Sequence, residues 1–102
     1  MNTITVEELK ARLDAGEKVN LVDVREAHER ADFNIGGIHL PVGNIMMMET
    51  DAIDDLKEQE VIFYCRSGAR SGQACLFTQN LGYTNTFNLV GGMLAWREKF
   101  GG

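Results

Sequence analysis

Short apolar segments alternate with helical patterns along this chain, and that order restricts the possible folds more than any other feature. Strands are predicted at residues 19–24, 38–40, 61–64 and 86–90, where β-branched, aliphatic or aromatic side chains cluster. Helical patterns occupy residues 5–16 and 26–31, the stretch from Ser71 to Gly82, and the stretch after Gly91. This alternation predicts an α/β fold of βα units, with an open, mostly parallel sheet and helices on both faces.

The length and composition are those of one ordinary globular domain. The 102 residues suffice for one modest core, so a single domain over residues 1–102 is expected. No apolar run approaches the length of a membrane span, and the first residues lack the basic-then-apolar order of a secretory signal. We therefore expect no membrane association and a cytoplasmic location.

The net charge of −5 is distributed unevenly along the chain. Residues 1–60 hold 14 acidic and 6 basic side chains, whereas no carboxylate occurs between Val61 and Arg97. An acidic chain without a cluster of lysines and arginines repels a phosphate backbone, so no nucleic-acid partner is expected. The carboxylate-free stretch predicts a locally positive site that would attract a small anion.

Two local patterns give further structural expectations. Thr5 and Glu8 have the spacing of a capping box at the start of the first helix, and Gly16 marks its end. Residues 46–48 are three methionines, which are expected to fill gaps in the core. The acidic residues between 49 and 60 are expected on a solvated helix face.

The two cysteines, Cys65 and Cys75, are ten residues apart and are expected to be free thiols. Cys65 ends the most strand-like segment, where the C-terminal edge of a parallel sheet usually carries the ligand site. The small and basic residues that follow lead into a helix N-terminus, which predicts a nest of amides and a reactive thiolate. The alternative is that Cys65 is simply a small buried side chain, and this is the reading that we favour for Cys75.

Three segments in order resemble the signatures of single-domain rhodaneses, which are sulfurtransferases. Residues 21–26 (LVDVRE) resemble the first signature, residues 65–71 (CRSGARS) the active-site loop, and residues 88–96 (NLVGGMLAW) the C-terminal signature. The resemblance covers nearly the whole chain and implies a five-stranded sheet. It departs at residues 33–37 (FNIGG), where many relatives have Gly-His-Ile-Pro-Gly, with little expected consequence for function.

The resemblance implies that Cys65 is catalytic and moves a sulfane sulfur from thiosulfate, a polysulfide or a persulfide to an acceptor. The acceptor would be cyanide, a small thiol or a protein thiol, and no cofactor or metal is expected. The persulfide would rest in the loop formed by Arg66, Ser67, Gly68, Ala69 and Arg70. Arg66 would hold or steer the anionic donor.

In similar proteins the arginine at the end of this loop pairs with the aspartate of the first signature. Asp23 is therefore expected to pair with Arg70 and to support the loop, and Arg70 is expected to act mainly in structure.

Two other functions remain open from the sequence. The chain could be a non-catalytic binding or regulatory module of the same fold, or a carrier in a sulfur relay. A tyrosine-phosphatase-type or arsenate-type enzyme is disfavoured, because related phosphatases carry one more residue between cysteine and arginine than the six-residue stretch Cys65 to Arg70. His28 and His39 lack metal-ligand spacing and are expected to be structural, and Trp96 is expected in the core.

Overall fold

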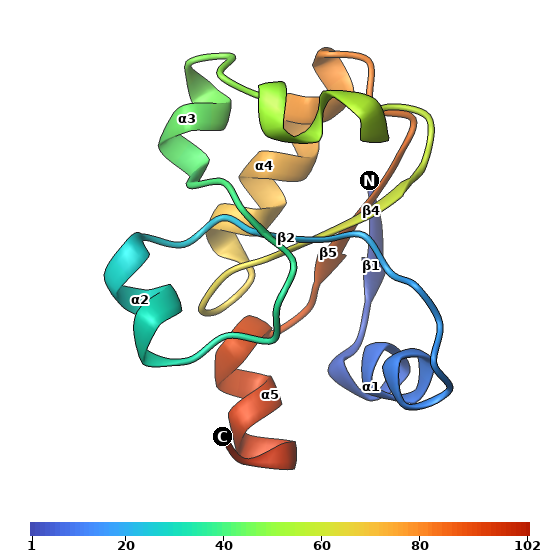
Figure 1. The fold of residues 1–102 in the computed structure, drawn as a ribbon, viewed down its shortest axis with the longest axis vertical. Helices are drawn as coiled ribbons and strands as arrows, with labels where there is room; N and C mark the ends of the chain where they lie inside the picture. The colour runs from blue at the N-terminus through green and yellow to red at the C-terminus, as the bar shows by residue number, and fades with distance from the viewer.

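The computed structural model describes residues 1–102 and contains one parallel sheet with helices on both faces (Figure 1). The strands are β1 (Asn2–Ile4), β2 (Leu21–Asp23), β3 (Ile38–His39), β4 (Glu60–Tyr64) and β5 (Asn85–Leu89). The helices are α1 (Val6–Asp14), α2 (Ala27–Asp32), α3 (Val42–Met46), α4 (Ala69–Asn80) and α5 (Gly92–Phe100), with a 3-10 helix, η1 (Asp51–Leu56). The sheet has five strands in the order β1-β5-β4-β2-β3, so the predicted fold class is confirmed.

The central strand β4 builds the core on both faces of the sheet, because its side chains alternate between them. Val61 and Phe63 enter a cluster beneath α3 and α4, and Cys65 at the end of the strand belongs to the same cluster. Ile62 and Tyr64 enter the opposite cluster with residues of α1 and α5, which lie on the other side of the sheet in Figure 1. A strand buried on both faces gives the continuous apolar run that was visible in the sequence.

The capping box of the first helix is confirmed. The Thr5 hydroxyl accepts a hydrogen bond from the Glu8 N–H at 3.1 Å, and the Glu8 carboxylate accepts one from the Thr5 N–H at 2.9 Å. Strand β1, just before this cap, was not among the strands predicted from the pattern. It pairs with β5, but it has three residues and only Ile4 is buried, so its apolar pattern is too short to detect.

The expectation for the three methionines is wrong. Met46 ends α3, and Met47 and Met48 follow it; the three expose 49%, 71% and 66% of their surface, so they do not fill the core. The core beneath this region is filled instead by Ile45, Ile53 and neighbouring aliphatic side chains. The acidic stretch behaves as predicted in part: the carboxylates of η1 are exposed, while Ile53 is buried beneath them.

The C-terminal ends of the inner strands meet at one edge of the sheet. Asp23 lies beside Tyr64, and Phe63 lies beside Asn88, so the turns that follow β2, β4 and β5 converge there. Cys65 is at the centre of this edge because β4 is the middle strand. No helix combines the length and apolar character that crossing a membrane requires.

Candidate active site

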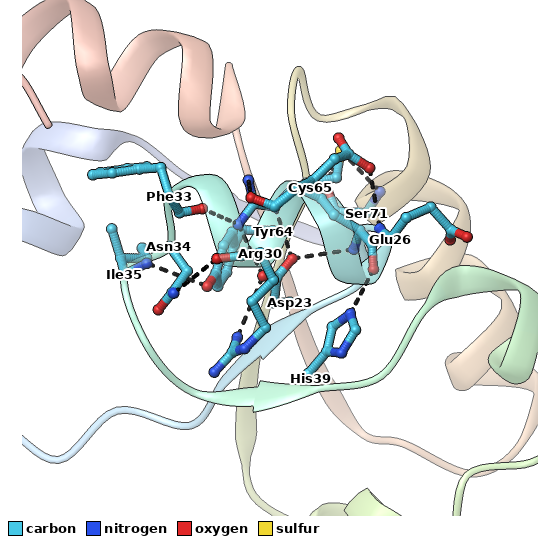
Figure 2. Close-up of polar contacts among 12 residues, drawn as sticks. Asp23, Glu26, Arg30, Phe33, Asn34, Ile35, His39, Tyr64, Cys65 and Ser71 are labelled. Carbon is cyan, nitrogen blue, oxygen red and sulfur yellow. Dashed lines mark hydrogen bonds and ion pairs between the residues drawn. The ribbon is translucent and has the colours of Figure 1, made fainter.

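The side chain of Cys65 is enclosed by the loop that follows it. The residue is 1% exposed, and its Sγ accepts hydrogen bonds from the Gly68 N–H at 3.1 Å and from the Ser71 N–H at 3.4 Å. The Ser71 hydroxyl oxygen also lies 3.4 Å from Sγ, and Figure 2 shows the two residues side by side. Donors are thus directed at the sulfur from the loop and from the first turn of α4.

These donors change the acidity of the thiol. Burial by itself raises the pKa of Cys65, but hydrogen bonds from Ser71 and from the amides of Gly68 and Ser67 outweigh it, so the net pKa lies below the ordinary value. The hydrogen bonds are the main causes of this lowering, and Arg70 is also coupled electrostatically to the sulfur. A buried sulfur that is more acidic than usual is suited to act as a nucleophile.

The start of α5 holds the cysteine loop in place from behind. The Met93 N–H donates to the carbonyl of Cys65 at 2.9 Å, and the Leu94 N–H donates to that of Arg66 at 3.0 Å. A side chain at Gly92 has no room, because a Cβ there would lie 2.4 Å from the Cys65 carbonyl oxygen, and the backbone φ is +52°. Glycine at this position is what allows α5 to approach the loop so closely.

The predicted pair between Asp23 and Arg70 is wrong. The Arg70 guanidinium binds both carboxylate oxygens of Glu29 on α2, at 2.7 and 2.8 Å. The hydrogen bonds from Arg70 lower the pKa of Glu29 to about 2, below its ordinary value of 4.5, although burial by itself raises it; the Glu26 N–H adds to the lowering. The acid beside the cysteine loop therefore comes from the acidic half of the chain, and it neutralises Arg70.

Asp23 has a nearer partner. Its carboxylate is fully buried and binds the Arg25 guanidinium twice, at 2.9 Å each, and it also accepts from the Arg25 N–H at 3.1 Å. Arg30 from α2 adds a contact at 3.3 Å, which Figure 2 shows. Burial by itself raises the pKa of Asp23. The hydrogen bonds and charge of Arg25 and the hydrogen bond from Arg30 lower it by more, so the net pKa lies below the ordinary value. Arg25 also donates to the Phe33 carbonyl, so Asp23 supports the turn around α2 rather than the cysteine loop directly.

A pocket of about 230 Å³ lies beside the cysteine loop, between α2 and α5. Its lining combines charged side chains with an apolar part; the residues are Arg25, His28, Glu29, Asp32, Arg66, Met93, Leu94 and Arg97. Arg25 and Glu29 are engaged by the ion pairs described above, whereas Arg66, next to the cysteine, is exposed and carries no hydrogen bond or ion pair through its guanidinium. Arg66 is thus a cation available to an anion in this pocket.

The two histidines and Cys75 make no hydrogen bond to Cys65 or to the loop that follows it. The His39 ring donates from Nε2 to the carbonyl of Arg25 at 2.7 Å, as Figure 2 shows, and His28 lines the pocket. No group of three or more His, Cys, Asp or Glu side chains is arranged to hold a metal ion. Cys75 is fully buried in the core, and burial raises its pKa to about 11, which confirms its structural interpretation.

Comparison with known proteins identifies the family. The chain matches the Rhodanese-like domain over residues 5–99. It belongs to that family. A sulfurtransferase of Allochromatium vinosum is 40% identical over 97 residues, which span 94% of this chain and 88% of that protein. The human thiosulfate:glutathione sulfurtransferase is 31% identical, with 95% of this chain and 94% of that protein covered.

Solved structures agree with this rhodanese-like assignment. The human single-domain sulfurtransferase TSTD1 superposes with a TM-score of 0.79 and 32% identity over 97% of each chain. The sulfurtransferases among the relatives support transferase activity in this protein.

Three residues of this rhodanese-like site escaped the sequence analysis. Ser71 and Asn88 stood inside two of the quoted signatures, but nothing in the linear pattern said that the Ser71 hydroxyl lies 2.5 Å from the Asn88 side-chain oxygen. Glu29 could not be identified because α2 has no buried residue, and so no apolar pattern in the sequence shows which side of the helix faces the site. A signal existed in its spacing: Glu26 and Glu29 are three residues apart, and Glu29 caps the amide of Glu26.

Proposed function

We propose that this rhodanese-like protein transfers a sulfane sulfur through a persulfide on Cys65. The observation that carries the proposal is the buried Sγ of Cys65, which receives hydrogen bonds from Gly68 and Ser71 and has a lowered pKa. The donor is thiosulfate or a polysulfide or persulfide, and the acceptor is a thiol or cyanide. Residues 1–102 act as one domain in this reaction.

The chemistry proceeds in two half-reactions. In the first, the Cys65 thiolate attacks the outer sulfur of thiosulfate; a new S–S bond forms, the bond to the inner sulfur breaks, and sulfite leaves with the electron pair. In the second, the nucleophilic acceptor attacks the outer sulfur of the persulfide and the Cys65 thiolate leaves. A thiolate acceptor becomes a persulfide, and cyanide becomes thiocyanate. No external oxidant or reductant is required.

The loop supplies the electrostatic part of this mechanism. The amides of Ser67, Gly68 and Ser71 favour a negative charge on the Cys65 sulfur before the first attack and again when the Cys65 thiolate leaves in the second half-reaction. We propose that Arg66 binds the sulfonate end of thiosulfate, since its guanidinium is exposed at the pocket and unpaired. Ala69 is exposed and adds only a methyl group to the loop.

Mass spectrometry of the intact protein after treatment with thiosulfate tests the proposal. We expect a gain of one sulfur atom, located on the peptide that contains Cys65, and its loss when cyanide or a thiol is added. Cys75→Ala is the matched control and should gain the sulfur, whereas Cys65→Ser should not. Absence of the persulfide with thiosulfate and with polysulfide would contradict the proposal and favour a non-catalytic binding module.

A further inference from the structure

Asn88, at the end of β5, contacts two separate parts of the cysteine loop with one side chain. Its Nδ2 donates to the Gly68 carbonyl at 3.1 Å, and its Oδ1 lies 2.5 Å from the Ser71 hydroxyl oxygen. The N–H groups of Gly68 and Ser71 both bind the sulfur of Cys65. Asn88 is therefore linked to both ends of the nest around the reactive sulfur.

The donor and acceptor properties of these groups decide where the Ser71 proton lies. The Gly68 carbonyl can only accept, so the NH₂ group of the Asn88 amide must face it and the amide oxygen must face Ser71. A serine hydroxyl has a single proton, and two acceptors compete for it: Asn88 Oδ1 at 2.5 Å and Cys65 Sγ at 3.4 Å. While Cys65 is a neutral thiol, the shorter contact takes the proton, and the hydroxyl presents a lone pair to the sulfur.

A lone pair directed at the sulfur suits a neutral thiol, whose S–H can donate to Ser71, better than a thiolate. When Cys65 loses its proton, the Ser71 hydroxyl can donate to the sulfur only by giving up its bond to Asn88. We propose that Asn88 is a positioning residue that competes with the Cys65 thiolate for the Ser71 proton and thereby limits the fraction of Cys65 that is ionised. The proposal rests on Cys65 being the reactive thiol, as in the proposed function.

Other charged groups near the loop are left unchanged by a substitution at Asn88. They are Arg66 and Arg70 from the loop and α4, Arg25 and Glu26 from the turn before α2, His28, Glu29 and Asp32 from α2, and Arg97 from α5. Arg70 is coupled electrostatically to Cys65, and its charge is paired with Glu29. A change in thiol acidity after Asn88→Ala, which adds no charge, would therefore report on Ser71.

The test is the rate of alkylation of Cys65 by iodoacetamide as a function of pH, measured in the native protein by mass spectrometry of the Cys65 peptide. Asn88→Ala should move the midpoint to lower pH and increase the thiolate fraction about two- to tenfold, the range expected when one hydrogen bond is redirected. The double variant Ser71→Ala/Asn88→Ala should have the same alkylation midpoint as the single variant Ser71→Ala. Asn85→Ala, on the same strand but bonded to Asn2, is the matched control and should have no effect.

A merely structural role for Asn88 would give a different pattern. Asn88→Ala would then lower the midpoint of urea unfolding and leave the alkylation midpoint unchanged, or shift it equally in both Ser71 backgrounds; either result overturns the proposal. Asn88→Asp, whose carboxylate accepts more strongly from Ser71, serves if Asn88→Ala does not fold. It should decrease the thiolate fraction, and by more when Ser71 is present than when it is alanine; equal decreases would count against the proposal.

The assay uses no sulfur donor, so it separates the two hypotheses. Failure to form a persulfide would contradict the proposed function and would leave the alkylation result standing. An unchanged alkylation midpoint would contradict only the role of Asn88.

Discussion

Replacing Glu29 by glutamine should show how much the ion pair with Arg70 contributes to stability. Glutamine keeps an oxygen that can accept from the Glu26 N–H, so the helix cap is preserved while the charge is removed. The fall in the pKa of Glu29 from 4.5 to about 2 would correspond to about 3 kcal/mol if water did not reach the pair. The two side chains are 19% and 30% exposed, so screening reduces the expected loss at pH 7 to about 1 to 2 kcal/mol.

The stability difference between the wild-type protein and Glu29→Gln should depend on pH. Because the pKa of Glu29 is lowered in the folded state, its contribution is complete above the ordinary value of 4.5 and disappears as the pH falls toward about 2. The wild-type protein should therefore be more stable than Glu29→Gln at pH 7, and the difference should shrink steadily below pH 4.5.

Urea unfolding of the two proteins at a series of pH values measures that difference. Glu26→Gln is a control on the preceding turn, because its side chain forms no ion pair. The reasoning would be refuted if the stability difference between wild type and Glu29→Gln were the same at pH 3 as at pH 7, or if Glu26→Gln reproduced it.

Three further substitutions follow from the structure. Asp23→Asn should lower the free energy of unfolding by about 3 to 5 kcal/mol in urea titration, because it leaves a buried guanidinium without its charge partner; a loss under 1 kcal/mol would contradict this. Gly92→Ala should destabilise the protein by more than about 1 kcal/mol through its clash with the Cys65 carbonyl, whereas Gly43→Ala, which meets open space in a helix, should not. Cys75 should remain unlabelled by iodoacetamide in the native protein at pH 8 and react on unfolding, since it is fully buried; labelling at the rate of Cys65 would disprove that assignment.

Much of the fold could be predicted because each major element has a strong local pattern. The run Val61–Tyr64 is apolar throughout, as a strand buried on both faces must be, and Thr5 with Glu8 marks a helix start within four residues. Strand β1 escaped because its only buried side chain is Ile4, and it is held in the sheet by pairing with β5, which is distant in sequence. The methionines were misplaced because their apolar character says nothing about whether the chain turns outward after α3.

Part of the site could also be predicted from the sequence, and part could not. The position of Cys65 at a strand end and the small residues after it were local features, and they led to the amide nest that surrounds its sulfur. The partner of Arg70 depended on which of several acids reached it in space. Arg25 is only two residues after Asp23 and binds both oxygens of its carboxylate. Arg70 forms its ion pair with Glu29 instead.

The sequence by itself determined the alternation of four strands with helices, the cysteine at the edge of the sheet and the family, because these depend on patterns within short segments. The tertiary structure decided which charges and hydroxyls meet across the strands. A carboxylate-free stretch from Val61 to Arg97 does not make a carboxylate-free site, because α2 brings Glu29 to Arg70 from 41 residues away in the chain. Ser71 likewise owes its position between sulfur and amide to the packing of α4 against β5. Such contacts depend on distance in space, which local residue patterns do not encode.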